Sequence, residues 1–175
     1  LEREGRHRSI AHQRFDDIAG DLVELDAVLE LIAGRVGAHV DLKVRGSETD
    51  IVASVIGALG VGNVIITTAE DSSVRTIQRW ARQHAPGLLV GLSSAARSHG
   101  SGLVPRWKAQ IASCFPRLRI WLSGANLVVS HKLVARLSLK AYARRRGLQR
   151  GVWTVDGEDE LLRWMNDPDV WMVTT

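Results

Sequence analysis

The sequence has a single cysteine, a single tyrosine and only four prolines among its 175 residues. One thiol, Cys114, excludes an internal disulfide framework and a cysteine-based zinc site. Because Cys114 ends an apolar stretch, we interpret it as a small core residue and not as a nucleophile. With no disulfide to form, the redox compartment stays open, and a reducing cytoplasm is slightly favoured.

Long apolar runs are also absent. No stretch of roughly 18 apolar residues occurs, so the sequence predicts no transmembrane segment. The charged start, 1–8, lacks the apolar region of a secretory signal. No G-x-G-x-x-G follows an apolar run and no G-x-x-x-x-G-K-[ST] occurs, so the known glycine-rich phosphate loops are missing.

What is present is the composition of a globular protein. Hydrophobic residues make up 45% and charged residues 24% of the chain, and the formal net charge is +4. We therefore expect one domain over 1–175. Many basic residues lie in the segment 132–146, which we interpret as a helix with a solvated outer face. A nucleic-acid or anionic-lipid patch is the alternative, and we predict no nucleic-acid partner.

Two patterns alternate along the chain. Short, nearly continuously apolar runs are typical of strands buried on both faces of a parallel sheet. These predicted strands are 39–44, 64–68, 88–92, 127–130, 152–155 and 170–174. Amphipathic stretches between them predict helices at 22–33, 49–59, 72–84, 132–146 and 157–165. Asp71 and Asp156 are the predicted N-caps of two of these helices, and the segment 117–122 fits either a strand or a loop.

This β-α repetition predicts an α/β fold in which helices cover a parallel sheet. An open doubly wound sheet and a closed (β/α)₈ barrel both satisfy it. The loop 93–105, rich in Ser and Gly and containing His99, follows a strand end. We interpret it as an ordinary connection, with an active-site loop as the alternative.

Asp41 and Lys43 are the most informative polar residues. They lie two apart in an apolar run, so both point to one side of the predicted strand. Burying such charges is costly unless they are paired or functional. An aspartate there can bind a divalent cation and a lysine can hold a phosphate oxygen, while a structural ion pair is the alternative. Trp153, in another strand, either lines a pocket or packs in the core.

Four segments carry a family resemblance. They are 24–31 (ELDAVLEL), 39–43 (HVDLK), 151–156 (GVWTVD) and 169–175 (DVWMVTT). They resemble, in order, the helix "tLdEvLel", the strand "l-x-I-E-I/L-K", the strand "v-x-v-W-T-V-N" and the terminal "G-V-D-g-i-i-T-D/N" of the glycerophosphodiester phosphodiesterases. The likeness extends over nearly the whole chain.

The resemblance implies a TIM (β/α)₈-type barrel, incomplete here with about six parallel strands and without the N-terminal ones. It implies metal-dependent hydrolysis of glycerophosphodiesters to an alcohol and glycerol 3-phosphate, with Mg²⁺ or Ca²⁺ as cofactor. Asp41 takes the place of a metal-ligating carboxylate, which is usually Glu in the family. Lys43 takes the place of the phosphate-contacting lysine, and Trp153 that of a residue lining the glycerol site.

The sequence also departs from the family. The motifs His-Arg-Gly, Glu-x-Asp and His-Asp, which carry the catalytic histidines and two metal ligands, are absent. His12, His39 and His131 do not lie in such motifs, and we interpret them as non-catalytic. Three hypotheses stay open: part of a working phosphodiesterase, an inactive relative that binds a phosphate ester or a protein, and an unrelated open α/β domain. Unpaired strand edges predict that the chain alone aggregates or dimerises, or is completed by another chain.

Overall fold

The computed structural model describes residues 23–94, 116–132 and 139–174. Within these ranges six parallel strands form one sheet in the order β1-β2-β3-β4-β5-β6, so each strand pairs with its neighbour in sequence. The strands are β1 (Ala38–Leu42), β2 (Val64–Thr68), β3 (Leu89–Ser94), β4 (Leu127–His131), β5 (Gln149–Trp153) and β6 (Val170–Val173).

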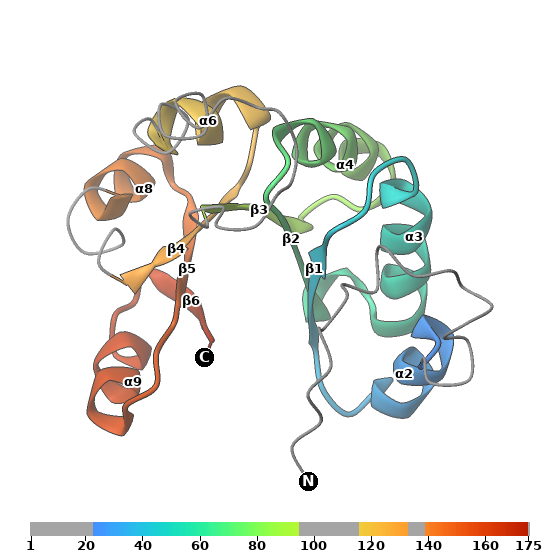
Figure 1. Cartoon of the computed structure of the whole chain (residues 1–175), viewed down its shortest axis with the longest axis horizontal. Helices are drawn as coiled ribbons and strands as arrows, with labels where there is room; N and C mark the ends of the chain where they lie inside the picture. Colours follow the sequence, from blue (N-terminus) through green and yellow to red (C-terminus); the bar gives the residue numbers. More distant parts are fainter. Residues whose placement is uncertain (1–22, 95–115, 133–138, 175) are drawn as a thin grey trace, which may run out of the picture.

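Helices cover the outer side of this sheet, which curls into part of a barrel (Figure 1). They are α2 (Leu25–Ile32), α3 (Glu48–Leu59), α4 (Asp71–His84), α6 (Pro116–Ser123), α8 (Lys140–Arg146) and α9 (Glu158–Met165), with the short 3₁₀ helix η3 (Val61–Asn63). A doubly wound sheet carries helices on both faces. The described residues therefore have the barrel-like arrangement, incomplete at six strands, and not the open one.

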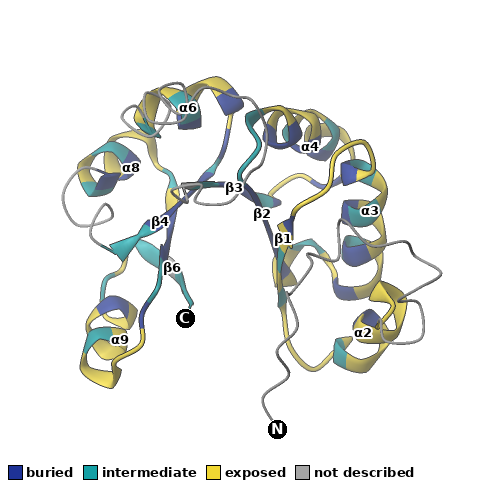
Figure 2. Cartoon of the chain, viewed as in Figure 1, coloured by how far each residue is buried: buried dark blue, intermediate teal, exposed yellow. Residues whose placement is uncertain are grey.

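The strands are apolar throughout because both of their faces are covered. Ile66 of β2 is buried with Val52 and Ile77 in the large core between sheet and helices. Its neighbour Ile65 points to the other face, where it packs in a smaller inner cluster. The remaining members of the inner cluster are Leu89, Leu127, Val129, Trp153 and Met172. Figure 2 shows the buried residues along the strands and on the inner sides of the helices.

Three local predictions are wrong. Asp71 is the first residue of α4 and not its cap; its carboxylate pairs with Arg119 at 2.8 Å. Asp156 does not cap α9, where Gly157 holds the N-cap position without a side-chain hydrogen bond. The segment 117–122 is neither strand nor loop but lies within α6. At Asp71 the contact with Arg119 outweighs the local capping preference.

Other predictions lie outside the described residues, namely those on Cys114, His12 and the loop containing His99. Of the basic segment 132–146 the structure describes both ends, and Arg144, Arg145 and Arg146 are exposed there, as a solvated face requires. In the described part of the chain, no helix combines the length and apolarity that crossing a bilayer requires. Association with a second copy stays a prediction.

Candidate functional site

Asp41 lies on the inner face of β1, the strand at one end of the sheet. The next residue, Leu42, points the opposite way into the outer core and is 5% exposed. The sequence predicted Asp41 inside a buried strand, but its side chain is 36% exposed because β1 pairs on one side only within the described residues. The charged carboxylate of Asp41 therefore costs less free energy here than it would if it were buried in a central strand.

Lys43 was predicted inside a strand at 39–44, but β1 ends at Leu42 and Lys43 follows it. Its ammonium donates to Oδ2 of Asp41, so the ion pair considered from sequence is present. The Lys43 side chain is 74% exposed. An ammonium has three donors, so those not used by Asp41 can reach a ligand.

A threonine and a histidine hold the other side of Asp41. Thr67 is the register partner of Asp41 on β2, and its hydroxyl lies 3.1 Å from Oδ1 of Asp41. The ring Nε2 of His39 lies 2.8 Å from the same hydroxyl. Partial burial lowers the pKa of His39; Asp41 opposes that shift and Lys43 adds to it.

Trp153 ends β5 and packs against the inner cluster. It is the register partner of His131 at the end of β4, and the two rings meet edge to face, with centroids 5.5 Å apart and an interplanar angle of 81°. Both side chains are half-buried. Together the two rings form an aromatic surface at the carboxyl ends of two adjacent strands. Such a surface can pack against an apolar part of a ligand.

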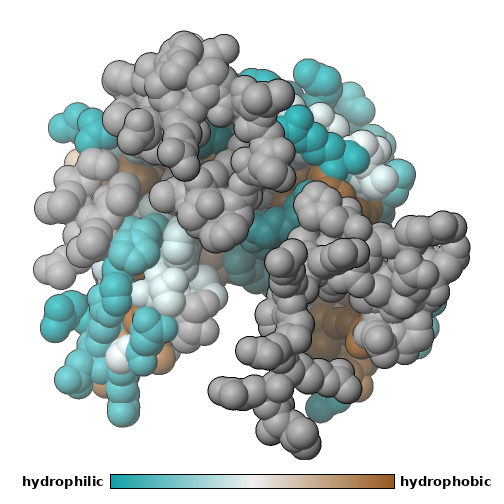
Figure 3. Space-filling view, in the orientation of Figure 1, coloured by the Kyte–Doolittle hydropathy of each residue, from teal (hydrophilic) through white to brown (hydrophobic). Residues whose placement is uncertain are grey.

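The structure places Asp41 and Trp153 on the same inner face and in the carboxyl-terminal halves of their strands. Their strands, β1 and β5, lie toward opposite ends of the sheet order, and the sheet curls between them (Figure 1). The space-filling view shows the molecule hollowed between the two ends of the sheet (Figure 3). In (β/α) barrels this end of the strands carries the chemistry.

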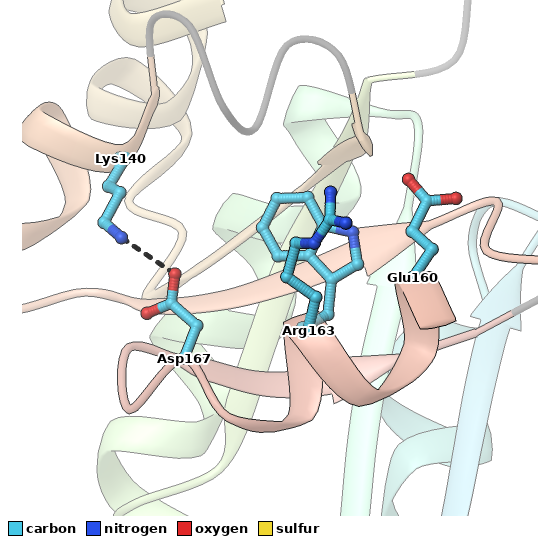
Figure 4. A pocket seen from close by; sticks show the side chains of 5 residues that line it. Lys140, Glu160, Arg163 and Asp167 are labelled. Carbon is cyan, nitrogen blue, oxygen red and sulfur yellow. Dashed lines mark hydrogen bonds and ion pairs between the residues drawn. The ribbon is translucent and has the colours of Figure 1, made fainter. Parts of the chain in front are cut away.

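A pocket of about 320 Å³ lies elsewhere, between α8 and α9 on the outer layer. Lys140 reaches across it to Asp167, while Glu160 and Arg163 project from α9 (Figure 4). Trp164 forms its apolar wall. Lys140 and Asp167 pair with each other at 2.9 Å, and Glu160 pairs with Lys132 at 2.7 Å, so three of its four charged groups are already engaged. We therefore place the candidate site on the inner face and not in this pocket, because barrel chemistry occurs at the carboxyl ends of the strands.

Sequence reasoning did not identify Thr67 as part of the site. Its signal was weak, a hydroxyl in the last two residues of an otherwise apolar strand. His39 lies two residues before Asp41 on the same strand, and its hydrogen bond to Thr67 could not be predicted from the sequence. Both contacts depend on the register of β1 against β2.

The described residues do not by themselves fit a divalent cation. Oδ1 of Asp41 already accepts from Thr67, and Oδ2 from Lys43. Across 23–94, 116–132 and 139–174, no three His, Cys, Asp or Glu side chains lie together as a metal would require. A protein Ca²⁺ site takes roughly six to eight oxygen ligands and Mg²⁺ about six, so one carboxylate is not enough.

Comparison with known proteins defines the fold. The described geometry is that of a partial parallel (β/α) barrel. No family model and no curated protein matches the sequence. Among solved structures, the chain is similar to the glycerophosphodiester phosphodiesterase of Agrobacterium tumefaciens str. C58, with 19% identity and a TM-score of 0.58 over 87% of this chain. It is similar to that of Parabacteroides distasonis ATCC 8503, with 16% identity and a TM-score of 0.60 over 93%.

A third similar structure is the putative glycerophosphoryl diester phosphodiesterase of Silicibacter pomeroyi DSS-3, with 17% identity and a TM-score of 0.54 over 86% of this chain. This chain spans 58%, 66% and 52% of the three solved chains, respectively. The resemblance seen in the sequence is thus confirmed for the fold. Over the part that it spans, the chain has the TIM-barrel fold of the glycerophosphodiester phosphodiesterases.

Proposed function

We propose that this chain binds a glycerophosphodiester on the inner face of its sheet and takes part in hydrolysing it to an alcohol and glycerol 3-phosphate. One observation carries the proposal. Asp41 of β1, Lys43 directly after β1 and Trp153 of β5, the residues that match the family's motifs, belong to the inner face, where Lys43 pairs with Asp41 and Trp153 packs in the inner cluster. A cation and an aromatic wall on one face suit a ligand that has a phosphate and a short carbon chain.

Each residue has a role that its own chemistry supports. The Lys43 ammonium binds a nonbridging phosphate oxygen and offsets its negative charge. Trp153 lines the glycerol moiety. Asp41 holds the ammonium in place through their ion pair. The general acid and base are left unassigned, because the motifs that carry them in the family are absent from this sequence. A role for Mg²⁺ or Ca²⁺ at Asp41 stays a prediction.

The test is the release of glycerol 3-phosphate from glycerophosphocholine by the full chain, with Mg²⁺, Ca²⁺ or EDTA. Binding of glycerol 3-phosphate is measured alongside by calorimetry. The key variant is Lys43→Met, and Arg82→Met on the exposed side of α4 is its control. We expect Lys43→Met to lose binding and release while Arg82→Met keeps both. Unchanged binding in Lys43→Met overturns the proposal.

A second function is favoured by one observation, namely that both carboxylate oxygens of Asp41 are already engaged. Such a site holds a phosphate ester without supplying a free metal ligand. The chain is then a binding protein with this fold. Tight binding of glycerol 3-phosphate without any release from glycerophosphocholine, under all three metal conditions, is the result that this second function predicts.

A further inference from the structure

A continuous chain of hydrogen bonds ends at Lys43. It begins at His39, whose Nε2 lies 2.8 Å from the Thr67 hydroxyl, and continues over 3.1 Å from that hydroxyl to Oδ1 of Asp41. Oδ2 of Asp41 then accepts from the Lys43 ammonium. The four residues come from two adjacent strands and from the residue following β1. The register Asp41 to Thr67 brings them together.

The protons of this chain have one consistent direction. An ionised carboxylate only accepts, so Thr67 donates to Asp41. A threonine hydroxyl has one proton, so Thr67 must accept from His39. The proton that His39 donates is thus the one on Nε2. Every donor in the chain points toward Asp41, and the carboxylate is fixed on one oxygen while the other holds the ammonium.

Burial falls from Thr67 through Asp41 to Lys43. Thr67 is 1% exposed, whereas the side chains of Asp41 and Lys43 are 36% and 74% exposed. An exposed lysine samples many rotamers, and ordering it costs conformational entropy. A group held in its bound position before the ligand arrives avoids part of that cost. Thr67 is buried and therefore rigid, so its hydrogen bond can hold Asp41, and through Asp41 the Lys43 ammonium, in one position.

We infer that His39 and Thr67 are positioning residues of the phosphate site, acting through Asp41 on the Lys43 ammonium. The inference rests on the proposed function and deepens it. In this chain Asp41 serves the site by aiming a cationic side chain. The ligand class is a phosphate ester, bound by an ammonium donor without a divalent cation.

The experiment measures glycerol 3-phosphate binding to the full chain by calorimetry in EDTA. Thr67→Val removes the hydroxyl at nearly constant volume, and Thr67→Ser keeps it. Since a hydrogen bond to a charged group contributes about 1.5 kcal/mol, we expect Thr67→Val to weaken binding about tenfold. Thr67→Ser should restore binding to nearly the wild-type value. Thr76→Val, the same change at an exposed position of α4, should have no effect.

His39 provides an independent variant, because it is only partly covered and does not belong to the buried core. We expect His39→Phe, which removes the donor, to weaken binding, and His39→Gln, which keeps an N–H, to weaken it less. Thermal melts of every variant check the fold. Wild-type affinity in both Thr67→Val and His39→Phe overturns the inference. Equal losses in Thr67→Val and Thr67→Ser also overturn it, because they indicate packing alone.

Lys43→Met separates the two proposals. If it abolishes binding while the Thr67 and His39 variants bind normally, the inference fails and the proposed function stands. If glycerol 3-phosphate binds only after Mg²⁺ is added, the inference likewise fails and the proposed function stands. If Lys43→Met binds like the wild type, both fail.

Discussion

Nη2 of Arg150 lies 2.8 Å from Oδ2 of Asp167, in a part of the fold where Arg150 is only 1% exposed. Lys140 donates to the same oxygen at 2.9 Å. Arg150 belongs to β5, Lys140 to α8, and Asp167 to the turn between α9 and β6. One carboxylate thus joins three elements of the barrel wall. A buried guanidinium is tolerated only when it is paired in this way.

The first prediction concerns this carboxylate and pH. Burial by itself raises the pKa of Asp167, but the hydrogen bonds from Lys140 and Arg150 outweigh it and lower the pKa to about 2. Because the folded pKa is below the ordinary value of 3.8, the stabilisation is complete above that value. It is lost as the pH falls from 3.8 toward about 2.

Asp167→Asn should therefore lower the free energy of unfolding at pH 7 by about 3 kcal/mol, since it leaves Arg150 buried with a weaker partner. The difference from wild type should shrink as the pH falls below about 4. Urea denaturation across this pH range measures it. Glu30→Gln, at an exposed position of α2, is the control and should change little. A difference independent of pH would contradict the pairing.

The second prediction concerns Glu48 and Ser73, which join α3 to α4. The Ser73 hydroxyl donates to Oε1 of Glu48 at 2.6 Å, and the Gly46 N–H donates to Oε2 at 2.7 Å. The bond from Ser73 is the main cause that lowers the pKa of Glu48. Ser73→Ala should cost about 1–2 kcal/mol of unfolding free energy.

The same change should raise the pKa of Glu48 toward its ordinary value, which an NMR titration of the carboxyl carbon measures. Ser72→Ala, one residue earlier and exposed, is the matched control and should stay within about 0.5 kcal/mol of wild type. Equal effects of the two substitutions would show that the hydroxyl of Ser73 has no special role.

The third prediction concerns Gly91 on the inner face of β3. A Cβ there would lie 2.6 Å from Cγ2 of Val129 and 3.3 Å from Cγ2 of Thr67. Both neighbours are β-branched and stiff, so they cannot rotate away easily. Gly91→Ala should destabilise the fold by about 1–3 kcal/mol. Adding Val129→Ala should recover part of the loss.

Gly57 provides the opposite case in the same experiment. It lies inside α3, and a Cβ there meets no atom within 4 Å. Gly57→Ala should raise the free energy of unfolding by about 0.5–1 kcal/mol, because alanine favours the helix. Thermal denaturation of the two variants should shift in opposite directions. Shifts in the same direction would contradict the close packing at Gly91.

The fourth prediction concerns Trp153. Within the described residues its buried Nε1–H meets no acceptor, so Trp153→Phe removes no hydrogen bond there. The smaller ring retreats from His131 and from the proposed glycerol site. We expect Trp153→Phe to weaken glycerol 3-phosphate binding about three- to tenfold, since an aromatic contact contributes about 0.5–1.5 kcal/mol. Trp121→Phe on α6, where Trp121 is 56% exposed, should bind like the wild type.

Most of the sheet could be predicted from the sequence because its strands are covered on both faces. Val64 to Ile66 shows why: adjacent residues of β2 enter different clusters, so no polar position interrupts the run. α6 could not be predicted in the same way. Leu118, Trp121 and Leu122 are 50%, 56% and 52% exposed, so its apolar residues do not mark a buried helical face.

The candidate site was predictable only in part. Asp41 and Lys43 stand out as charges in or beside an apolar strand, whatever they pair with. A threonine in an apolar strand carries no such signal. Thr67 becomes part of the site only when β1 and β2 are aligned so that it lies beside Asp41, and that register is a tertiary property. The family resemblance identifies the residues that match the motifs, but it does not identify the residues that hydrogen-bond to them.

The strand order has a consequence for how this chain opens. Since every strand pairs with its sequence neighbour, each β-α unit can detach from an end without breaking any pairing farther inside. Local opening of this kind exposes the amides of the outermost units first. Deuterium should therefore enter β1 and β6 well before β3 and β4, in a gradient running inward from both ends. The proposed phosphate-binding residues of β1 then lie in one of the parts that open most readily.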